Sequence, residues 1–306
     1  IIGFSSAEQR IRRVARDHGV LVRLKLGSIP EPKYKKNTLN LFRLIKNPIT
    51  LVEKLIFFFK KKIEKIVAKK YFPDYFVVGG IKSMSGINDK KTSIIKAHNM
   101  DYDFFIHEKQ VKLNKKTNSI VFIDGGGAYH TDDIRLGLTP GVTADNYYPV
   151  INRGLHEIEK SLKLNIKIAA HPKSNFEISQ KKYNHPIFEN KTFELIRDAD
   201  IVVSHNSTSL QWAIIMKKPI ILVKTDEIEN ASYAKNFKNS IDEFAVILGK
   251  RVVNLSQLSS VNNWKDYLNV DDEKYEKYIE NYVKTKGSPE KLLWNIVIEY
   301  IEKDLF

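Results

Sequence analysis

Short apolar runs alternate with helical patterns through the second half of the chain, and this alternation constrains the fold more than any other feature. Amphipathic stretches such as 147–162, with apolar residues three or four positions apart, indicate helices. Strands that alternate with helices form parallel sheets that are covered on both faces. The sequence therefore predicts an α/β fold with parallel sheets. The runs that we interpret as strands cover residues 119–123, 166–170, 201–204, 219–223 and 252–255.

A shorter pattern of the same kind precedes residue 107. Residues 20–26 and 75–80 are predicted to be strands, and 101–106 is predicted to be a short last strand of this first unit. The chain opens within a helical pattern, so we expect the first strand of the unit to lie upstream of Ile1. The polar stretch 107–118 is the candidate linker to the second unit. Two domains also fit the chain length of 306 residues, since domains mostly run about 100–200 residues. Further helices are expected at 193–198, 210–216, 241–250, 272–285 and 288–303.

The net charge of +14 is distributed unevenly. Residues 1–120 carry 26 basic and 10 acidic side chains, so the remaining 24 basic and 26 acidic side chains leave residues 121–306 at −2. The basic excess peaks on a predicted amphipathic helix over 51–70. Such a helix can pack on its own domain with a solvated lysine face, bind an anionic membrane surface, or contact nucleic acid. Its mostly lysine face, with poor interleaving of aromatic and arginine residues, does not favour nucleic acid.

Several classes of protein are excluded by missing motifs. The chain has no cysteine, so it has no disulfide framework and no thiol nucleophile. It lacks the glycine fingerprints of dinucleotide and P-loop binding, the nucleophile elbow of hydrolases and the HExxH zinc motif. No strictly apolar run is longer than that of Leu55–Phe59, which is too short to span a bilayer. Two D-x-D motifs, 101–103 and 198–200, and the group His130, Asp132 and Asp133 are weak metal candidates, and we expect no metal.

Unusual residues follow three of the predicted strands. In open α/β sheets ligands bind beyond the carboxyl ends of the strands, so we expect these residues to converge. Asp124, followed by three glycines, can take a proton from an attacking hydroxyl, or it can form a turn with its own backbone. The glycines, including Gly125 and Gly126, allow a ligand to approach the backbone closely.

The other two strand ends carry groups suited to an anion. His171 precedes Pro172, which disfavours a helical conformation at the histidine, so the imidazole can assist a phosphate leaving group or can be structural. Ser207, Thr208 and Ser209 lie where a strand passes into a helix. They can bind a phosphate through the helix N-terminus or simply cap the helix.

These residues and their surroundings resemble a known family. The segments 168–174, 192–195, 202–209 and 218–220 resemble bacterial glycosyltransferases of surface-polysaccharide gene clusters, of the sialyltransferase-like and Kdo-transferase-like GT-B type. Those proteins share an acidic-Gly motif, an HP motif and a Ser/Thr motif. Here these are Asp124-Gly125, His171-Pro172 and Ser207-Thr208-Ser209, and Ile123 stands where the first motif often has a second acid. The resemblance extends from about residue 98 to about residue 225.

The resemblance implies two Rossmann-like domains that face each other across a cleft. Residues 1–110 would form the acceptor domain, 111–287 the nucleotide-sugar donor domain, and 288–306 a helix that crosses back to the first domain. It implies an inverting, metal-independent transfer of a sialic-acid-like or Kdo-like sugar from a CMP donor to a surface glycan or glycolipid, with no cofactor. Asp124 would be the base and His171 would assist the leaving group. The donor-binding residues would be Gly125, Gly126, Pro172, Lys173, His205, Ser207, Thr208 and Ser209.

The expected partners are therefore the donor, the glycan acceptor and an anionic membrane reached through 51–70, and no nucleic acid. The expected location is the cytoplasm, peripheral on the inner face of the cytoplasmic membrane. The alternatives are a UDP- or GDP-sugar transferase of the same fold and a non-catalytic protein that binds a polyanion such as nucleic acid or glycan.

Overall fold

The computed structural model describes residues 19–27, 73–87, 92–110, 117–129 and 140–305, together with Pro30 and Phe59. The remainder of the predicted basic helix at 51–70 lies outside the described residues, as do His130, Asp132 and Asp133. No helix within the described ranges has the length and apolar character needed to cross a membrane.

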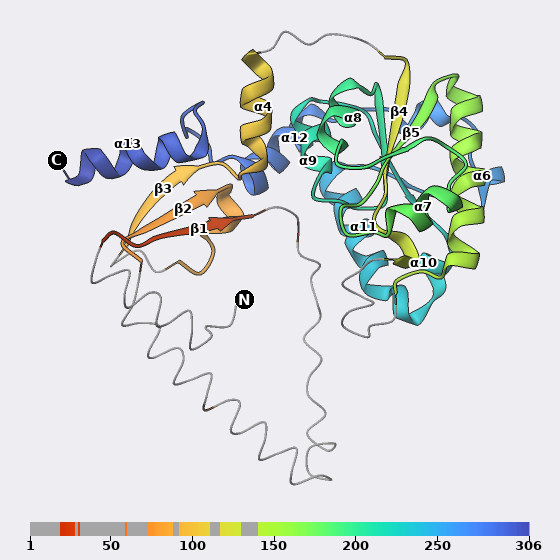
Figure 1. The fold of residues 1–306 in the computed structure, drawn as a ribbon, viewed down its shortest axis with the longest axis horizontal. Coiled ribbons are helices and arrows are strands. Elements are labelled where there is room, and N and C mark those ends of the chain that lie inside the picture. Colours follow the sequence, from red (N-terminus) through yellow and green to blue (C-terminus); the bar gives the residue numbers. More distant parts are fainter. Residues whose placement is uncertain are drawn as a thin grey trace.

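The first unit contains a parallel sheet of three strands, β1 (Val22–Leu26), β2 (Tyr75–Gly79) and β3 (Ser93–Ala97), in that order. Alternate side chains of a strand point to opposite faces. Tyr75, Val77 and Ile95 therefore share one face, where they pack against Leu293 and Ile296 of helix α13 (Leu293–Leu305). Helix α13 thus lies on the first sheet, although it follows the whole second unit in the sequence (Figure 1).

The prediction of a strand at 101–106 is wrong, because these residues begin helix α4 (Asp101–Gln110). Two acidic residues in the first turn, Asp101 and Asp103, favour a helix N-terminus. Tyr102 and Ile106 are four positions apart and are buried together in the core of the second unit. The last strand of the first unit is instead β3, whose residues were predicted to be a loop. A short 3-10 turn, Ile81–Met84, follows β2.

The second unit contains a parallel sheet of six strands in the order β6-β5-β4-β7-β8-β9. Numbered from its own first strand, this is 3-2-1-4-5-6, the Rossmann order. The central strand β4 is buried over its whole length, as the apolar sequence predicts. The strands are β4 (Ser119–Ile123), β5 (Asn165–Ala169), β6 (Ile187–Phe188), β7 (Ile201–Ser204), β8 (Ile220–Lys224) and β9 (Val252–Asn254).

Helices cover both faces of this sheet. On one face, α6 buries Tyr147, Ile151 and Leu155, which are four positions apart, against Ile120 and Phe122. On the other face, the alternate β4 residues pack against α4, α8, α9 and α12. The helices of the unit are α6 (Ala144–Leu162), α7 (Phe176–Lys182), α8 (Thr192–Asp198), α9 (Leu210–Ile215), α10 (Asp226–Asn230), α11 (Lys235–Leu248) and α12 (Asp272–Tyr278), with a π turn over Ile279–Val283. Short 3-10 turns lie at Gly127–Tyr129, Ser232–Ala234, Leu258–Ser260 and Trp264–Tyr267.

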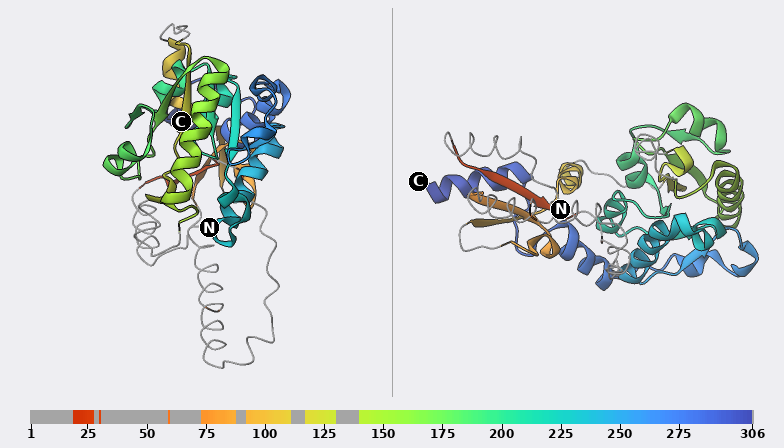
Figure 2. Two further views of the ribbon diagram at one scale, coloured as in Figure 1. Left: turned by 90° about the vertical axis from the view of Figure 1, so that its right-hand side faces the viewer. Right: turned by 90° about the horizontal axis from the view of Figure 1, so that it is seen from below.

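The two sheets occupy separate lobes, with α4 and α12 between them (Figures 1 and 2). The α/β fold class with two parallel sheets is therefore confirmed. A buried polar contact joins the units at the start of α4, where the Asn99 amide donates to Gln211 Oε1 over 2.5 Å. The Trp212 ring nitrogen donates to the Asp101 carbonyl over 2.9 Å. Gln211 and Trp212 belong to α9, so the helix that follows the serine cluster is fixed to the end of the first unit.

Candidate functional site

The sheet order places the three unusual strand ends side by side. Strand β4 lies between β5 and β7, with Ile123 opposite both Ala169 and Ser204. Asp124 therefore emerges level with the first residues beyond β5 and β7, and its backbone N–H donates to the Ala169 carbonyl over 3.0 Å. The chain runs from β4 to β5 on one side and later crosses to β7 on the other. Open α/β sheets bind ligands beyond the carboxyl ends at such a reversal of strand order.

Asp124 is almost fully buried, with 1% of its surface exposed. Its Oδ1 accepts hydrogen bonds from the Gly126 backbone over 3.1 Å and from the Tyr183 hydroxyl over 3.0 Å. Its Oδ2 is also buried but has no hydrogen-bond partner among the described residues. Burial raises the pKa of Asp124 to about 6, although the bonds from Tyr183 and from the glycine backbone oppose this rise. One oxygen is thus anchored, and the other keeps its lone pairs for a hydrogen donor.

The three positions after Asp124 differ in how strictly the structure requires glycine. Gly126 and Gly127 have φ angles of 85° and 48°, a region that favours glycine. A Cβ at Gly127 would also lie 3.2 Å from the Tyr148 hydroxyl oxygen. At Gly125, by contrast, an added Cβ would meet no atom of the described residues within 4 Å. The described residues therefore leave room beside the backbone at this position, which a ligand can occupy.

Tyrosines surround Asp124, and sequence analysis did not identify them. Tyr147 and Tyr148 come from the start of α6, and Tyr183 ends α7. The rings of Tyr147 and Tyr148 meet edge to face at 5.2 Å, and those of Tyr148 and Tyr183 at 5.1 Å. The adjacent Tyr147-Tyr148 pair in an amphipathic helix was the only sequence signal, and it is equally typical of core packing.

His205 is held within the same cluster rather than presented to a ligand. It is 1% exposed. Its Nδ1 lies 2.7 Å from the Val223 carbonyl, and its Nε2 lies 2.8 Å from the Tyr147 hydroxyl. A carbonyl only accepts, so Nδ1 carries the hydrogen and Nε2 accepts from Tyr147. Burial lowers the pKa of His205 to about 4, so the ring is neutral near neutral pH. The sequence-based role of His205 as a donor-binding residue is therefore indirect at most, because both ring nitrogens are engaged within the protein.

His171 lies beyond β5, in a turn that its own backbone closes. Its carbonyl accepts from the Ser174 backbone and hydroxyl over 3.0 and 2.8 Å. The Lys173 backbone N–H donates to His171 Nδ1 over 3.1 Å. Because Nδ1 accepts, the neutral ring carries its hydrogen on Nε2, which suits a donor to a phosphate oxygen. Pro172 and Lys173 are exposed beside it.

The serine cluster forms the turn between β7 and α9. The Ser207 hydroxyl accepts from the Ser209 backbone over 3.2 Å, and the Ser207 carbonyl accepts from Leu210. Thr208 is exposed. Helix α9 has only six residues, so its dipole contributes little, and the hydroxyl hydrogens are the main donors that this turn offers.

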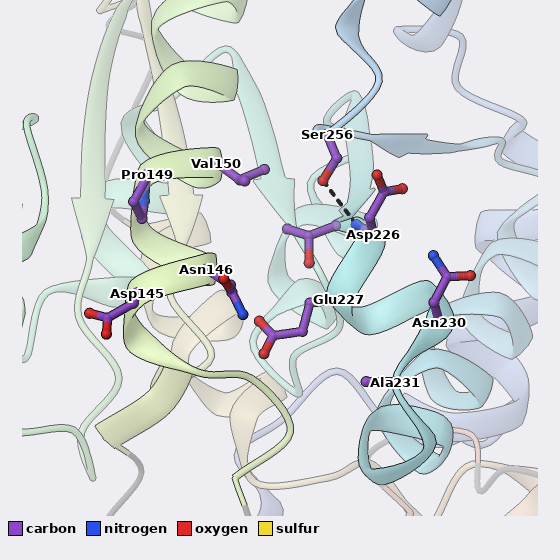
Figure 3. Close-up of a pocket in the computed structure, with 10 residues that line it drawn as sticks. Asp145, Asn146, Pro149, Val150, Asp226, Glu227, Asn230, Ala231 and Ser256 are labelled. Carbon is purple, nitrogen blue, oxygen red and sulfur yellow. Dashed lines mark hydrogen bonds between the residues drawn. The ribbon is translucent and has the colours of Figure 1, made fainter.

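A pocket of about 620 Å³ opens at the same edge of the sheet, beyond β8 and β9 (Figure 3). Its wall combines the first turns of α6 with the start of α10. Glu227 Oε1 accepts from the Thr143 backbone and hydroxyl over 2.9 and 2.7 Å, which ties these two elements together. None of the predicted site residues lies in this pocket. Its lining residues are Asp145, Asn146, Pro149, Val150, Thr225, Asp226, Glu227, Asn230, Ala231 and Ser256.

The two D-x-D motifs serve local structure. Asp103 Oδ1 accepts from the Leu293 backbone over 2.9 Å at the start of α13, and the Asp101 carboxylate accepts from the Gln211 amide. Asp198 pairs with Arg197, and Asp200 Oδ2 accepts from the Ser119 backbone over 3.1 Å at the opposite end of the sheet. Over the part of the chain that the structure describes, His, Asp and Glu side chains form no group of three able to hold a metal ion.

Comparison with known structures gives distant similarities in fold. A wall teichoic acid polymerase, TagF, aligns over 94% of this chain and 70% of its own, with 12% identity and a TM-score of 0.48. MurG of Acinetobacter baumannii aligns over 97% and 70%, with 10% identity and a TM-score of 0.40. A UDP-GlcNAc 2-epimerase from Neisseria meningitidis, bound to UDP-GlcNAc, aligns over 98% and 75%, with 13% identity and a TM-score of 0.38. No protein-family model and no curated protein matches the sequence. Similarity at this level assigns no activity, which must be inferred from the site itself.

Proposed function

We propose that this protein is a glycosyltransferase that moves a sugar from a nucleotide-sugar donor to a hydroxyl of a glycan or glycolipid acceptor. The observation that carries the proposal is Asp124. It is buried at the point where strand order reverses, one carboxylate oxygen has no partner among the described residues, and its pKa is raised to about 6. A general base works best when its pKa lies near the operating pH. The neighbouring strand ends supply the groups that a phosphate leaving group needs.

The chemistry follows from these positions. Asp124 Oδ2 accepts the proton of the acceptor hydroxyl as its oxygen attacks the anomeric carbon, and the bond from that carbon to the donor phosphate breaks. The sugar passes through an oxocarbenium-like state, and the negative charge moves to the departing phosphate. The His171 Nε2 hydrogen and the hydroxyls of Ser207, Thr208 and Ser209 stabilise that charge. A single displacement with one base inverts the anomeric configuration, and protein groups replace a metal in this scheme.

The donor and the acceptor bind to different units in this proposal. The second unit binds the donor, because its strand ends carry the phosphate-binding groups, with Gly125, Gly126, Pro172 and Lys173 lining the approach. The charge of residues 1–120, 26 basic against 10 acidic, supports an acidic acceptor or an anionic membrane as partner of the first unit. We place the protein in the cytoplasm, peripheral on the inner face of the cytoplasmic membrane, with 51–70 as the contact.

The donor is proposed to be CMP-linked, with a sialic-acid-like or Kdo-like sugar, on the strength of the motif resemblance. Thermal unfolding with CMP, UDP and GDP tests this choice. A nucleotide at about one hundred times its Kd stabilises the fold by roughly 2.7 kcal/mol. Stabilisation by UDP or GDP alone would transfer the proposal to those donors. Stabilisation by none of them, together with retention of DNA or RNA on filters at low salt, would replace it with polyanion binding.

The role of His171 has its own test. His171→Ala is expected to leave the unfolding temperature nearly unchanged, because the ring is only partly buried, and to abolish transfer in a product assay. The matched control is His156→Ala, an exposed histidine in the middle of α6, which should transfer at the wild-type rate. Wild-type turnover by His171→Ala would overturn the assignment of the leaving-group role.

A further inference from the structure

The two oxygens of the Asp124 carboxylate have unequal surroundings, and this inequality has a definite source. Oδ1 accepts two hydrogen bonds, whereas Oδ2 has no partner within the described part of the chain. The Gly126 bond is local, because its donor is a backbone N–H only two residues from Asp124. The Tyr183 bond spans 59 residues and comes from a different βα connection. Tyr183 is therefore the side chain able to select one orientation of the carboxylate.

Tyr183 is itself held firmly. It is 6% exposed, and its backbone N–H donates to the Ser179 carbonyl over 3.1 Å at the end of α7. Its ring meets Tyr148 edge to face, at 5.1 Å and 81°, and Phe122 of β4 at 6.2 Å and 64°. These contacts fix the direction of the hydroxyl before any ligand binds.

The other titratable groups around Asp124 do not duplicate this bond. Tyr147, Tyr148 and His205 are the groups of α6 and the β7 end that approach the carboxylate. The Tyr147 hydrogen is committed to His205 Nε2, because His205 Nδ1–H already donates to Val223. The buried Tyr148 hydroxyl has no hydrogen-bond partner in the described residues. Within the described chain, Tyr183 is thus the one side chain that donates to Asp124.

We infer that Tyr183 is a positioning residue of the transfer reaction: it anchors Oδ1 of Asp124 and so turns Oδ2 toward the acceptor hydroxyl. This inference rests on the proposed function for its catalytic consequence, but the contact itself is independent of it. The bond also opposes the effect of burial, since the Tyr183 hydroxyl lowers the pKa of Asp124. Without this bond the carboxylate would keep its proton to higher pH, so a smaller fraction of Asp124 would be ionised near neutral pH.

Tyr183→Phe tests the inference, because it removes the hydroxyl and keeps the ring. A hydrogen bond to a charged group changes the carboxylate pKa by about one to two units. We expect the acidic limb of the profile of kcat/KM against pH to move up by that amount, with about a two- to tenfold loss near pH 7 that is recovered at higher pH. The matched control is Tyr148→Phe, which removes a hydroxyl from the adjoining ring but no bond to Asp124 and should leave the limb in place.

A second measurement separates this inference from the proposed function. The difference in stability between each tyrosine variant and the same variant carrying Asp124→Asn, followed against pH, reports the pKa of Asp124 without any turnover. If the pH midpoint of this stability difference shifts in Tyr183→Phe but not in Tyr148→Phe, the contact is supported. This holds even if no transfer is found, in which case only the proposed function fails. An unchanged midpoint, or an equal shift in Tyr148→Phe, overturns the inference. If Tyr183→Phe does not fold, 3-fluorotyrosine at position 183, a stronger donor, should lower the midpoint, and a midpoint that does not fall would overturn it.

Discussion

Replacing Asp124 by Asn should make the protein progressively more stable relative to wild type as the pH rises toward neutrality, while removing its activity. Burial raises the pKa of Asp124 from 3.8 to about 6 in the folded protein. The folded state therefore holds the proton more tightly than the unfolded state, and the stability from this group is fully present below about pH 4. It is lost as the pH rises to about 6, because the folded protein must then carry a buried charge. A shift of about 2 units corresponds to about 3 kcal/mol at neutral pH.

Asparagine removes the charge but not the shape. Its carbonyl oxygen can accept the bonds from Gly126 and Tyr183, while its amide occupies the position of Oδ2 without a partner among the described residues. That unpaired amide costs about 1–3 kcal/mol at every pH, which can cancel the absolute gain. Because this cost is the same at every pH, it does not affect how the stability difference between the variant and the wild type changes with pH. The variant should therefore gain about 2 kcal/mol relative to wild type between about pH 4.5 and about pH 7.5.

Unfolding curves of both proteins across this range measure the gain. The exposed Asp145→Asn serves as a control, because it removes a carboxylate charge at a helix terminus and not a buried one. Transfer by Asp124→Asn should fall by about a hundredfold or more. A difference in stability that is flat with pH, or that has the opposite sign, would refute the idea that Asp124 carries a buried charge at neutral pH. Undiminished transfer would refute its role as base.

Two further predictions concern the contact between the units and the basic segment. Gln211→Leu should lower stability by roughly 2–4 kcal/mol, since it leaves the Asn99 amide and the partly buried Asp101 carboxylate without their partner; an unchanged unfolding temperature would show that this contact is dispensable. Replacing Lys60, Lys61 and Lys62 together by Glu should abolish binding to anionic liposomes in a sedimentation assay, and equal binding by the variant would remove 51–70 as the membrane contact.

Five of the six strands of the second unit were predictable because they are short apolar runs with few alternatives, whereas the two-residue strand β6 was not predicted. β4, β7 and β8 match the predicted runs to within one residue at either end. The segment 101–106 was not predictable in the same way. Its aromatic residues are typical of strands, but Tyr102 and Ile106 are buried in the core of the second unit when this segment is a helix that packs on α9. This outcome depends on neighbours more than ninety residues away, which local patterns do not contain.

The candidate site also contains residues that the sequence identified and residues that it did not. Asp124, His171 and the serine cluster were identified from their positions after apolar runs, and those positions are local properties of the sequence. The cluster of Tyr147, Tyr148 and Tyr183 was not identified, because tyrosines on amphipathic helices have no local mark of a site. The burial of His205 was also missed, since a histidine after a strand can equally well face solvent.

The sequence by itself determined where the strands end and which polar residues follow them, because a run of apolar residues and a glycine turn act over a few positions. Only the tertiary structure decided that β4 lies between β5 and β7, so that the three strand ends meet. It also decided that Asp124 is buried beside Tyr183 with one oxygen anchored. The ionisation of a carboxylate depends on its solvation and its hydrogen bonds, and both are supplied here by residues that are distant in sequence.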